Sequence, residues 1–344
     1  MESRSSSTLQ AVSRPGCFFK EEAAGVESAI KRRLSGEELT ALVERAFQGQ
    51  RRLEGFEELK DGWFNSAYAL TLDNGMKTVL KLAPGSEEGM LRYERNVMTA
   101  EVEVLRLLAA ADGIPVPGIL YEERGVEGSE WFLMEFVPGD PYNKVKERLK
   151  PEERRDIEVE LGRVNRRINE IQGKRFGYYA REDSQGDSWP AVFTNMIGGL
   201  LADAADQAVA LPMDAEEVFA LLRERQASLA EVTVPRLVHW DLWDGNVFVK
   251  DRRLIAIIDC ERALWGDPLM EYYFRSFVEN GAFLDGYGKQ DFTLAERERM
   301  ALYDLYIALI LHIECRFRQY IDANHIRWAE EHLARTWSGL NKDV

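Results

Sequence analysis

The sequence predicts an α+β protein in which a small, strand-rich N-terminal part precedes a larger and mostly helical C-terminal part. Alternating apolar residues and turn signals predict strands between residues 68 and 136, whereas helical periods dominate from residue 151 onward. The segment Val137-Pro138-Gly139-Asp140 punctuates the chain between these two patterns. A length of 344 residues also suggests about two domains of roughly 150 residues each. We therefore expect a tail or arm at residues 1–34, a first lobe at 35–137 and a second lobe at 138–344.

The charge balance excludes one class of partner. The chain has 44 Lys and Arg against 59 Asp and Glu, a net charge of -15, and a pI near 5.0. A chain this acidic repels a phosphate backbone, so we expect no nucleic-acid partner and favour a neutral or cationic one. The apolar content of 45% is ordinary for a globular protein in water.

The spacing of the cysteines and the length of the apolar runs indicate the cellular compartment. Cys17, Cys260 and Cys315 are too widely spaced for a disulfide framework or a paired-cysteine metal site, which favours a reducing compartment. The longest apolar run, near residues 305–313, is under half of the ~20 residues that a membrane-spanning helix needs. It predicts a buried core helix and no membrane partner. The first 19 residues lack the apolar core of a secretory signal, so we expect a cytoplasmic protein.

The N-terminal elements follow from local signals. Ser35-Gly36-Glu37-Glu38 has the spacing of a helix-capping box, and apolar residues follow it at helical intervals. Two antiparallel strands, around 68–72 and 79–82, flank the hairpin signal Asp73-Asn74-Gly75. A helical period from Glu87 to Ala111 ends at a segment rich in Gly and Pro. Two further strands are expected near 118–122 and 130–136.

The C-terminal elements are mostly helices. Helical periods are expected at about 151–172, 190–208, 214–232, 271–280 and 294–335, with a strand pair near 247–258. No internal repeat is found, and no low-complexity segment follows the Ser-rich start.

One segment of the C-terminal part contains polar residues at a spacing typical of a catalytic site. The run from His239 to Asn246 matches H-x-D-L-x-x-x-N, and Asp259 ends an apolar strand thirteen residues after Asn246. Phosphoryl transfer needs a carboxylate that orients the attacking hydroxyl and accepts its proton, a role that suits Asp241. It also needs oxygen ligands for Mg²⁺, which suits Asn246 and Asp259. In the alternative interpretation, Asp241, Asn246 and Asp259 are ordinary turn, loop and strand-end residues, and their ordered spacing is a coincidence.

A lysine in the N-terminal part extends the pattern. Lys81 lies on the second strand of the hairpin, where a kinase places the lysine that holds the α- and β-phosphates. Alone, Lys81 would be interpreted as a solvated strand lysine, but the downstream motif favours the phosphate role. Such a lysine needs an acidic partner on the following helix. Glu94, Glu101 and Glu103 are the candidates, and Glu101 ranks first.

Together these motifs resemble those of the aminoglycoside phosphotransferase and choline kinase-like group of small-molecule kinases. The resemblance runs from about Leu53 to Phe274, with the pieces in the family's order. It implies a two-lobed protein-kinase-like fold, with a small N-terminal lobe of antiparallel sheet plus helix and a larger, mostly helical C-terminal lobe. ATP or GTP would bind between the lobes, and the C-terminal helices would hold the acceptor. The matching pieces are residues 79–81, 101–105, 115–117, 132–139, 239–246, 258–261 and 266–268.

The resemblance also implies a role for individual residues. Lys81 looks like the phosphate-binding lysine and Glu101 like its ion-pair partner, while Asp241 resembles the catalytic base. Asn246 and Asp259 resemble the Mg²⁺ ligands, and Glu261 is a further candidate for the metal shell or for orienting substrate. His239 is expected to be a structural hydrogen-bonding residue. The hinge that meets the nucleotide base would be formed by Met134, Glu135, Phe136 and Val137.

The sequence departs from the family pattern in the phosphate loop. No G-x-G-x-x-G precedes Lys81, and the corresponding turn, residues 61–66, holds one glycine. We therefore expect the Ser66 hydroxyl and nearby backbone N–H groups to contact phosphate instead. Among the aromatic residues near the motif, Trp240 is expected in the core. Trp243 and Trp265 are left open between the core and the stacking of an acceptor.

The leading hypothesis is a nucleotide-dependent O-phosphotransferase that acts on a small hydroxylated molecule. An aminoglycoside-like antibiotic ranks first, with a choline- or ethanolamine-type amino alcohol or a sugar metabolite as rivals. A Ser/Thr protein kinase is disfavoured because Cys260-Glu261 replaces Phe-Gly and no A-P-E follows. A pseudokinase that binds nucleotide without turnover is the alternative from another class. Seven acids against four bases between residues 239 and 271 favour Mg²⁺ and a cationic acceptor. ATP and GTP remain equal candidates, and the sequence predicts no oligomeric state.

Overall fold

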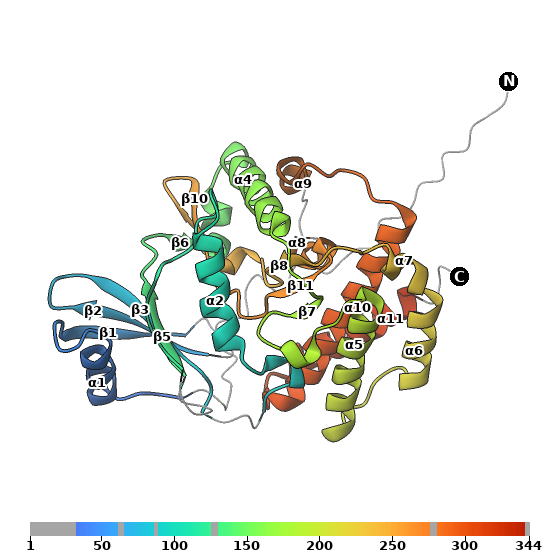
Figure 1. Cartoon of the computed structure of the whole chain (residues 1–344), viewed down its shortest axis with the longest axis horizontal. Coiled ribbons are helices and arrows are strands. Elements are labelled where there is room, and N and C mark those ends of the chain that lie inside the picture. Colours follow the sequence, from blue (N-terminus) through green and yellow to red (C-terminus); the bar gives the residue numbers. More distant parts are fainter. Residues whose placement is uncertain (1–31, 61–64, 86–88, 125–129, 276–280, 341–344) are drawn as a thin grey trace.

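A computed structural model describes residues 32–60, 65–85, 89–124, 130–275 and 281–340. The predicted tail at 1–34 falls almost wholly outside this part, as do residues 61–64 of the predicted phosphate loop. The described chain forms two lobes, with the N-terminal sheet on one side and the helices of the C-terminal part on the other (Figure 1). Helices α2 (Val97–Ala109) and α4 (Pro151–Glu170) lie between them.

The N-terminal lobe is built on a five-stranded antiparallel sheet with the order β1-β2-β3-β5-β4. Strands β2 and β3 form the predicted hairpin, and Gly75 has the positive φ of 78° that its turn requires. Strand β1 was not predicted. It is a half-exposed edge strand that reads L-E-G-F-E-E-L, without clean alternation. The strands are β1 (Leu53–Leu59), β2 (Ser66–Leu72), β3 (Lys77–Leu82), β4 (Ile119–Glu123) and β5 (Trp131–Glu135).

Helix α1 (Gly36–Ala46) covers one face of this sheet. Its predicted capping box is present: the Ser35 side chain accepts from the Glu38 N–H, and the Glu38 carboxylate accepts from the Ser35 N–H. Leu39 and Val43 of α1 pack with apolar residues of β2, β3 and β5 in a separate cluster, which we call the α1-side core. The other face of the sheet turns toward α2.

The helix predicted from Glu87 begins later than the sequence indicated. A 3₁₀ turn, η1 (Arg92–Glu94), precedes α2, and Asn96 interrupts the helical path with a φ of 61°. Glu94 therefore lies outside the helix that carries Glu101. Asn tolerates the left-handed region better than most residues, which explains the break where the apolar period alone continues.

The chain leaves the first sheet after β5 and joins a second one. Strand β6 (Asp140–Pro141) pairs with β9 (Val247–Lys250), which pairs in turn with β10 (Arg253–Ile257). A Cβ on Gly139 would lie 2.6 Å from Ile255 Cδ1 and 2.8 Å from the Val249 carbonyl oxygen, so this crossing needs glycine. A third small sheet has the order β7-β11-β8, from β7 (Gly177–Tyr178), β11 (Leu264–Gly266) and β8 (Arg236–Val238).

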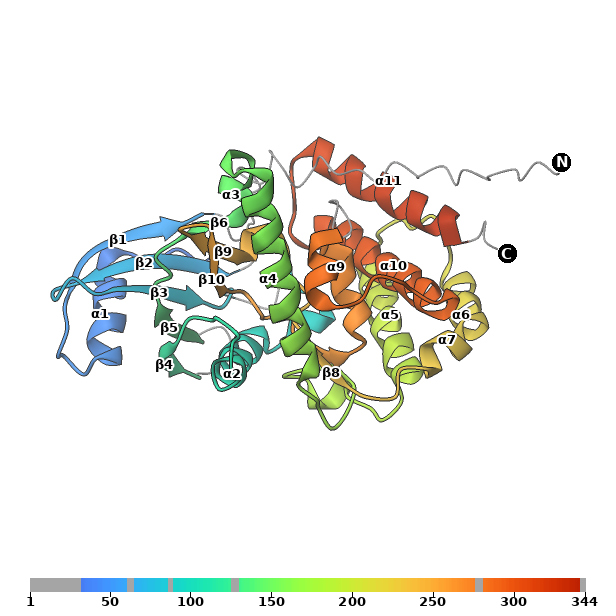
Figure 2. The same cartoon turned by 90° about the horizontal axis from the view of Figure 1, so that it is seen from above.

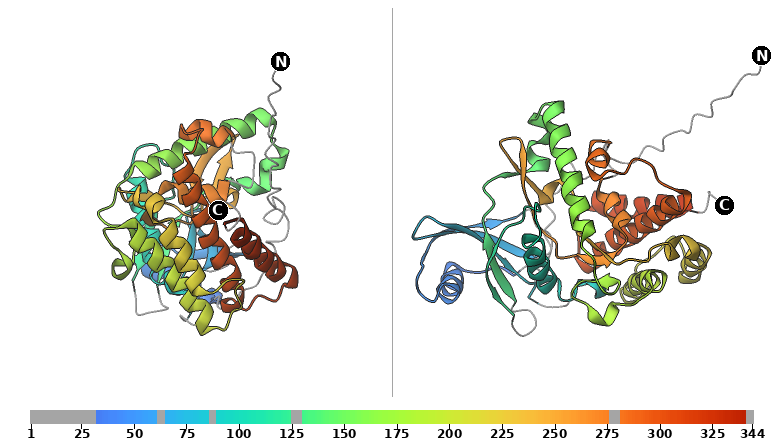
Figure 3. Two further views of the ribbon diagram at one scale, coloured as in Figure 1. Left: turned by 90° about the vertical axis from the view of Figure 1, so that its right-hand side faces the viewer. Right: turned by 45° about the horizontal axis from the view of Figure 1, so that its top comes forward.

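The C-terminal helices surround these small sheets, and two of the predicted helices are each divided in two. The predicted stretch 214–232 breaks at Arg225, and the stretch 294–335 is interrupted between Phe317 and Ala323. Helix α9 was not predicted, and residues 276–280 of the stretch predicted at 271–280 lie outside the described residues. Figures 2 and 3 show α11 lying along α10. The helices are α3 (Tyr142–Val145), α4, α5 (Trp189–Asp206), α6 (Ala215–Glu224), α7 (Gln226–Ala230), α8 (Tyr272–Arg275), α9 (Gly281–Tyr287), α10 (Leu294–Phe317) and α11 (Ala323–Leu340).

The main core extends across both lobes. It joins apolar side chains of β3, β5 and α2 to those of α4, α5 and α10. The apolar run near 305–313 is buried within α10, as predicted. Within the described ranges, no helix is both long and apolar enough to cross a membrane.

Candidate active site

Lys81 lies at the centre of a buried group of acids. It sits on β3 opposite Ala67 of β2, on the face that turns toward α2, because its neighbours Leu80 and Leu82 pack in the α1-side core. Its side chain is 10% exposed, and Nζ lies 2.6 Å from Glu101 Oε1 and 2.7 Å from Asp259 Oδ1. One ammonium therefore joins the first sheet, α2 and the loop after β10.

Glu101 is the acid that meets Lys81, and the other two candidates lie elsewhere. Glu94 pairs with Arg318, and Glu103 lies 2.9 Å from Arg124 at the surface. Glu101 is fully buried, and burial raises its pKa to about 7, opposed by the charge of Lys81. Its second oxygen, Oε2, has no hydrogen-bond partner among the described residues.

Asp259 and Glu261 follow β10 directly and turn toward Lys81. Asp259 has a φ of 68°, an unusual backbone conformation for a residue other than glycine. Burial opposes its ionisation, but the ammonium of Lys81 lowers its pKa below the ordinary value. Glu261 accepts a hydrogen bond from the Asn65 amide, at the start of β2. A residue of the loop after β10 thus meets a residue of the predicted phosphate loop.

These carboxylates fit a hard cation. One oxygen each from Glu101, Asp259 and Glu261 lies within 4.8 Å of the others. All three donors are oxygens, which Mg²⁺ prefers, and Glu101 Oε2 is a buried acceptor that lacks a donor. The donor set therefore agrees with the Mg²⁺ expected from the sequence, and it adds Glu101 to the candidate ligands.

The loop after β8 carries Asp241 and is held by several hydrogen bonds. His239 Nε2 lies 3.0 Å from the Ile258 carbonyl oxygen, and the Asp241 N–H donates to His239 Nδ1 at 3.3 Å. Burial lowers the pKa of His239 to about 4, so its ring is neutral and acts as the structural hydrogen-bonding residue that was expected. Asn246 donates from Nδ2 to the Asp241 carbonyl oxygen at 2.9 Å, and its own carbonyl accepts from the Ile258 N–H at 3.0 Å.

A residue that the sequence did not reveal fixes the same loop. Glu271 is fully buried, and its two carboxylate oxygens accept from the backbone N–H groups of Trp240 at 2.9 Å and Leu242 at 3.0 Å. These donors flank Asp241. The G-D-P triplet just before Glu271 was recognised, but no local signal says that this glutamate turns inward.

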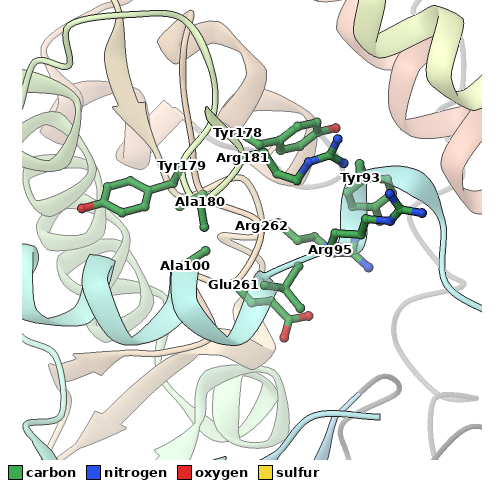
Figure 4. A pocket seen from close by; sticks show the side chains of 11 residues that line it. Tyr93, Arg95, Ala100, Tyr178, Tyr179, Ala180, Arg181, Glu261 and Arg262 are labelled. Carbon is green, nitrogen blue, oxygen red and sulfur yellow. The ribbon is translucent and has the colours of Figure 1, made fainter. Parts of the chain in front are cut away.

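The electrostatic surroundings of Asp241 differ from those of Asp259. Burial raises the pKa of Asp241 to about 8, and the nearby Arg262 guanidinium opposes this rise. Arg262 also lies over the ring of Tyr93, 5.9 Å from its centroid. Sequence reasoning missed Arg262 as well. Arg262 also lines a small pocket, together with residues just before and within the first turn of α2, residues 178–181, Glu261 and Ala263 (Figure 4).

The remaining predicted residues lie around this centre. Ser66 stands opposite Leu82 at the start of β2, out of phase with Lys81, so strand alternation turns its side chain toward the other face. Its contact with phosphate therefore stays a prediction without support from the register. The hinge residues Met134 and Glu135 end β5, next to Val79 and Thr78 of β3, and Phe136 and Val137 follow. This places the predicted hinge on the strand beside Lys81.

The three tryptophans have different surroundings. Trp240 is 1% exposed and stacks on Tyr306, with ring centroids 5.2 Å apart, as expected of a core residue. Trp265 packs against Tyr179 at 5.5 Å and covers Gly173. The ring of Trp243 lies over Gly245, where an added Cβ would be 2.2 Å away. Trp243 therefore helps to shape the loop between Asp241 and Asn246.

Comparison with protein families shows where this arrangement belongs. The sequence profile of the APH family, described as a phosphotransferase enzyme family, matches residues 55–303. The chain belongs to the APH phosphotransferase enzyme family. This confirms the resemblance seen in the sequence and the prediction of a phosphotransferase. A comparison with curated proteins gave no significant match.

Solved structures that resemble this APH family member confirm the kinase-like, two-lobed fold. A candidate fructosamine-3-kinase from Haemophilus somnus 129PT has a TM-score of 0.65 at 17% identity, with 87% of this chain and 96% of that one covered. Another from Thermobifida fusca YX-ER1 gives 0.63 at 19% identity, with 88% and 100% covered. A thermostable mutant of the aminoglycoside phosphotransferase APH(4)-Ia gives 0.60 at 20% identity, with 87% and 99% covered.

Proposed function

We propose that this APH family member transfers the γ-phosphoryl group of ATP or GTP to a hydroxyl of a small molecule, with an aminoglycoside-like compound as the first candidate. The observation that carries the proposal is the buried contact of Lys81 with both Glu101 and Asp259, beside a loop that presents Asp241. A lysine held in this way offers its ammonium to the phosphates of a bound nucleotide. Asp259 and the other acids then remain beside the transferred group.

The proton path follows from the position of Asp241. In its ionised form, Asp241 accepts the proton of the acceptor hydroxyl, whose oxygen attacks the γ-phosphorus. The bond from that phosphorus to the β–γ bridging oxygen breaks, and the nucleoside diphosphate leaves. Glu271 and His239 hold the loop so that the carboxylate keeps its direction. The roles of Lys81 and Asp241 differ, so each can be tested alone.

Mg²⁺ would be held by Asp259, with Glu261, Asn246 and Glu101 as further candidate ligands. When bound, it would neutralise the negative charge of the phosphates. Glu101 Oε2 supports a cation at this position because a buried carboxylate oxygen without a donor is costly.

Complexes of structurally similar proteins support a nucleotide and a small acceptor. A thermostable mutant of APH(4)-Ia has been solved with ADP and hygromycin B, and APH(2'')-IIa with ATP and streptomycin. An aminoglycoside 2'-phosphotransferase IIIa mutant has been solved with GDP, which keeps both nucleotides as candidates here.

A second acceptor class is favoured by one observation. The two candidate fructosamine-3-kinases superpose with TM-scores of 0.65 and 0.63, above the values of 0.59 to 0.61 of the aminoglycoside phosphotransferases compared. A sugar hydroxyl is therefore the second candidate. The choline-type acceptor has no comparable support.

The acidity of the motif region is a weaker argument for a cationic acceptor than its sequence suggested. Asp244 lies 2.8 Å from Lys146, Asp259 2.7 Å from Lys81, and Asp267 2.8 Å from Arg299. Glu271 accepts two backbone N–H groups. With Glu261, which accepts from the Asn65 amide, five of the seven acids between residues 239 and 271 are engaged within the protein, and Asp241 and Asp251 are the other two.

The proposal is tested by a coupled assay of ADP and GDP release with the purified chain. The acceptor panel contains aminoglycosides, a fructosamine, choline, ethanolamine and common sugars, each with ATP and with GTP. We expect release that depends on an aminoglycoside or on the sugar-type acceptor. Tight binding of Mg²⁺-nucleotide without release for any acceptor would favour a pseudokinase instead.

A further inference from the structure

Helix α2 is fastened to the C-terminal lobe by the six residues that precede it. We call this segment, residues 91–96, the α2 leader. Arg92 binds two acids at the end of α5: Nη1 pairs with Asp203, and Nη2 lies 2.5 Å from Asp206 Oδ2. The backbone of the leader is held too, because Arg181 donates to the Arg92 carbonyl oxygen. The leader thus contacts the C-terminal lobe through both side chain and backbone.

The strongest of these contacts is a buried ion pair. Glu94 and Arg318 are 2% and 1% exposed, and Arg318 Nη2 donates to Glu94 Oε1. Glu94 Oε2 accepts from the Leu91 N–H at 2.9 Å, which ties the carboxylate to its own turn. Arg318 follows directly on α10, the longest helix of the C-terminal lobe. A charge pair excluded from water in this way fixes geometry, because moving one partner away leaves the other as an uncompensated buried charge.

Helix α2 also shares its packing with the C-terminal lobe. Cys260, beside Asp259, donates from Sγ to the Glu101 carbonyl oxygen at 3.8 Å. Met98, Val102 and Leu105 of α2 belong to the main core. Among the described residues, the α1-side core of the sheet contains none from α2. The helix that carries Glu101 therefore packs in the core that joins both lobes, and its leader ties it to the lobe that carries Asp259.

We propose that Glu94 and Arg318 are positioning residues for phosphoryl transfer, which act by holding α2 and hence Glu101 in place beside Asp259. The proposal rests on the proposed role of Glu101 as the partner of the phosphate-binding Lys81. Glu101 and Asp259 together accept the Lys81 ammonium, so the position of α2 sets where that ammonium lies. Loss of the ion pair loosens the α2 leader, which Arg92 and Arg181 still hold in part, and lets Glu101 shift from Lys81, although neither Glu94 nor Arg318 touches substrate.

The test compares Arg318→Met with Arg318→Lys in the full-length protein. Nucleotide affinity is measured by calorimetry with Mg²⁺-ATP, and turnover by nucleoside diphosphate release. Leu39→Ala serves as the stability control, because it opens a cavity in the α1-side core without touching α2. We expect Arg318→Met to weaken nucleotide binding about tenfold, a size typical of coupling through a packed network. Arg318→Lys should keep most of the nucleotide affinity of the unaltered protein. Leu39→Ala should lower Tm and leave the nucleotide affinity unchanged.

The route through Glu101 is tested in a second background. In Glu101→Gln, the Arg318→Met change should add no further loss of nucleotide affinity, since residues that act through one another are not additive. Equal losses of nucleotide affinity in both backgrounds would show that the effect does not act through Glu101 and would overturn the proposal. A lower Tm with unchanged nucleotide affinity in Arg318→Met would overturn it too, because the ion pair would then only stabilise the fold. Lys81→Met separates this outcome from failure of the proposed function: if it too leaves nucleotide affinity unchanged, the assigned site itself is wrong.

Discussion

Glu271 accepts a hydrogen bond from the backbone N–H of Trp240 at 2.9 Å, although 31 residues separate them along the chain. Its other oxygen takes the N–H of Leu242, so a single buried carboxylate spans the residues on both sides of Asp241. The direction of the proposed base is thereby set by a residue outside the motif.

We expect Glu271→Gln to reduce turnover without changing nucleotide affinity. The amide offers one acceptor oxygen in place of two, so one backbone N–H is left unpaired at a cost of about 1–3 kcal/mol. Measured kcat should fall at least tenfold while the dissociation constant for Mg²⁺-ATP stays the same, since 1.4 kcal/mol corresponds to about a factor of ten. Unchanged kcat would show that the loop holds its shape without Glu271.

The effects of Lys81 on protein stability and on nucleotide affinity can be separated by substituting Glu101 as well. Lys81→Met leaves two carboxylates without the ammonium, the fully buried Glu101 and the partly exposed Asp259, and breaking a buried pair typically costs about 3–5 kcal/mol. Adding Glu101→Met removes the fully buried charge and should recover part of the loss in urea unfolding. Nucleotide affinity should stay low in both variants, because the ammonium is absent. Recovery of affinity in the double variant would contradict the phosphate-binding role of Lys81.

Two glycines set the crossing of α4 and α9. An added Cβ on Gly162 would lie 2.1 Å from the Phe283 carbonyl oxygen, and one on Gly286 would lie 2.0 Å from that of Val159. Because backbone atoms cannot move aside cheaply, Gly162→Ala should destabilise the protein by about 1–3 kcal/mol in urea unfolding. Gly199→Ala in α5 is the matched control, since a Cβ added there would have no neighbouring atom within 4 Å and Ala favours a helix. Equal stability of the two variants would disprove the close crossing.

Stability should fall as the pH drops from about 6.5 toward 4. Burial, aided by the charge of Arg335, lowers the pKa of His332 to about 4, whereas an unfolded histidine titrates near about 6.5. The unfolded chain therefore binds more protons in this window, and the contribution of His332, fully present above pH 6.5, is lost as the pH falls to 4. His332→Phe keeps the stacking on Trp328 and should flatten the decline of Tm in that range. His239 contributes in the same direction, so part of the decline should persist; an unaltered slope would argue against a neutral His332.

Local signals in the sequence predicted much of the fold. The capping box at Ser35, the Asp-Asn-Gly hairpin and the order of the motif residues each depend on a few neighbouring residues. The break between α10 and α11 has a weaker signal, since no Gly or Pro lies between Phe317 and Ala323 and Gln319 turns the chain with a φ of 53°. Asp322 caps α11 by accepting from the Asn324 and His325 N–H groups, but an acid alone does not end the helix before it. Tertiary packing decides where that helix ends.

The motif residues of the site could be predicted from the sequence, whereas the residues that hold them in place could not. The spacing from His239 to Asp259 singled out the loop, and with that motif the place of Lys81 on the hairpin strand pointed to Lys81 and to Glu101 on the following helix. Glu94 was interpreted as one of three acids on a helix, but it meets Arg318, which is 224 residues away. A charged residue becomes buried only when a distant partner compensates its charge, and no local pattern reveals that partner.

The most direct test of the proposed phosphotransferase chemistry is the Asp241→Asn variant in the nucleoside diphosphate release assay, with the acceptor identified by the screen. The amide cannot accept the hydroxyl proton, so we predict a fall in kcat of about 10²–10⁴-fold. The dissociation constant for Mg²⁺-ATP should stay within about twofold, because Lys81 and Asp259 are unchanged. Turnover equal to that of the unaltered protein would contradict Asp241 as the catalytic base.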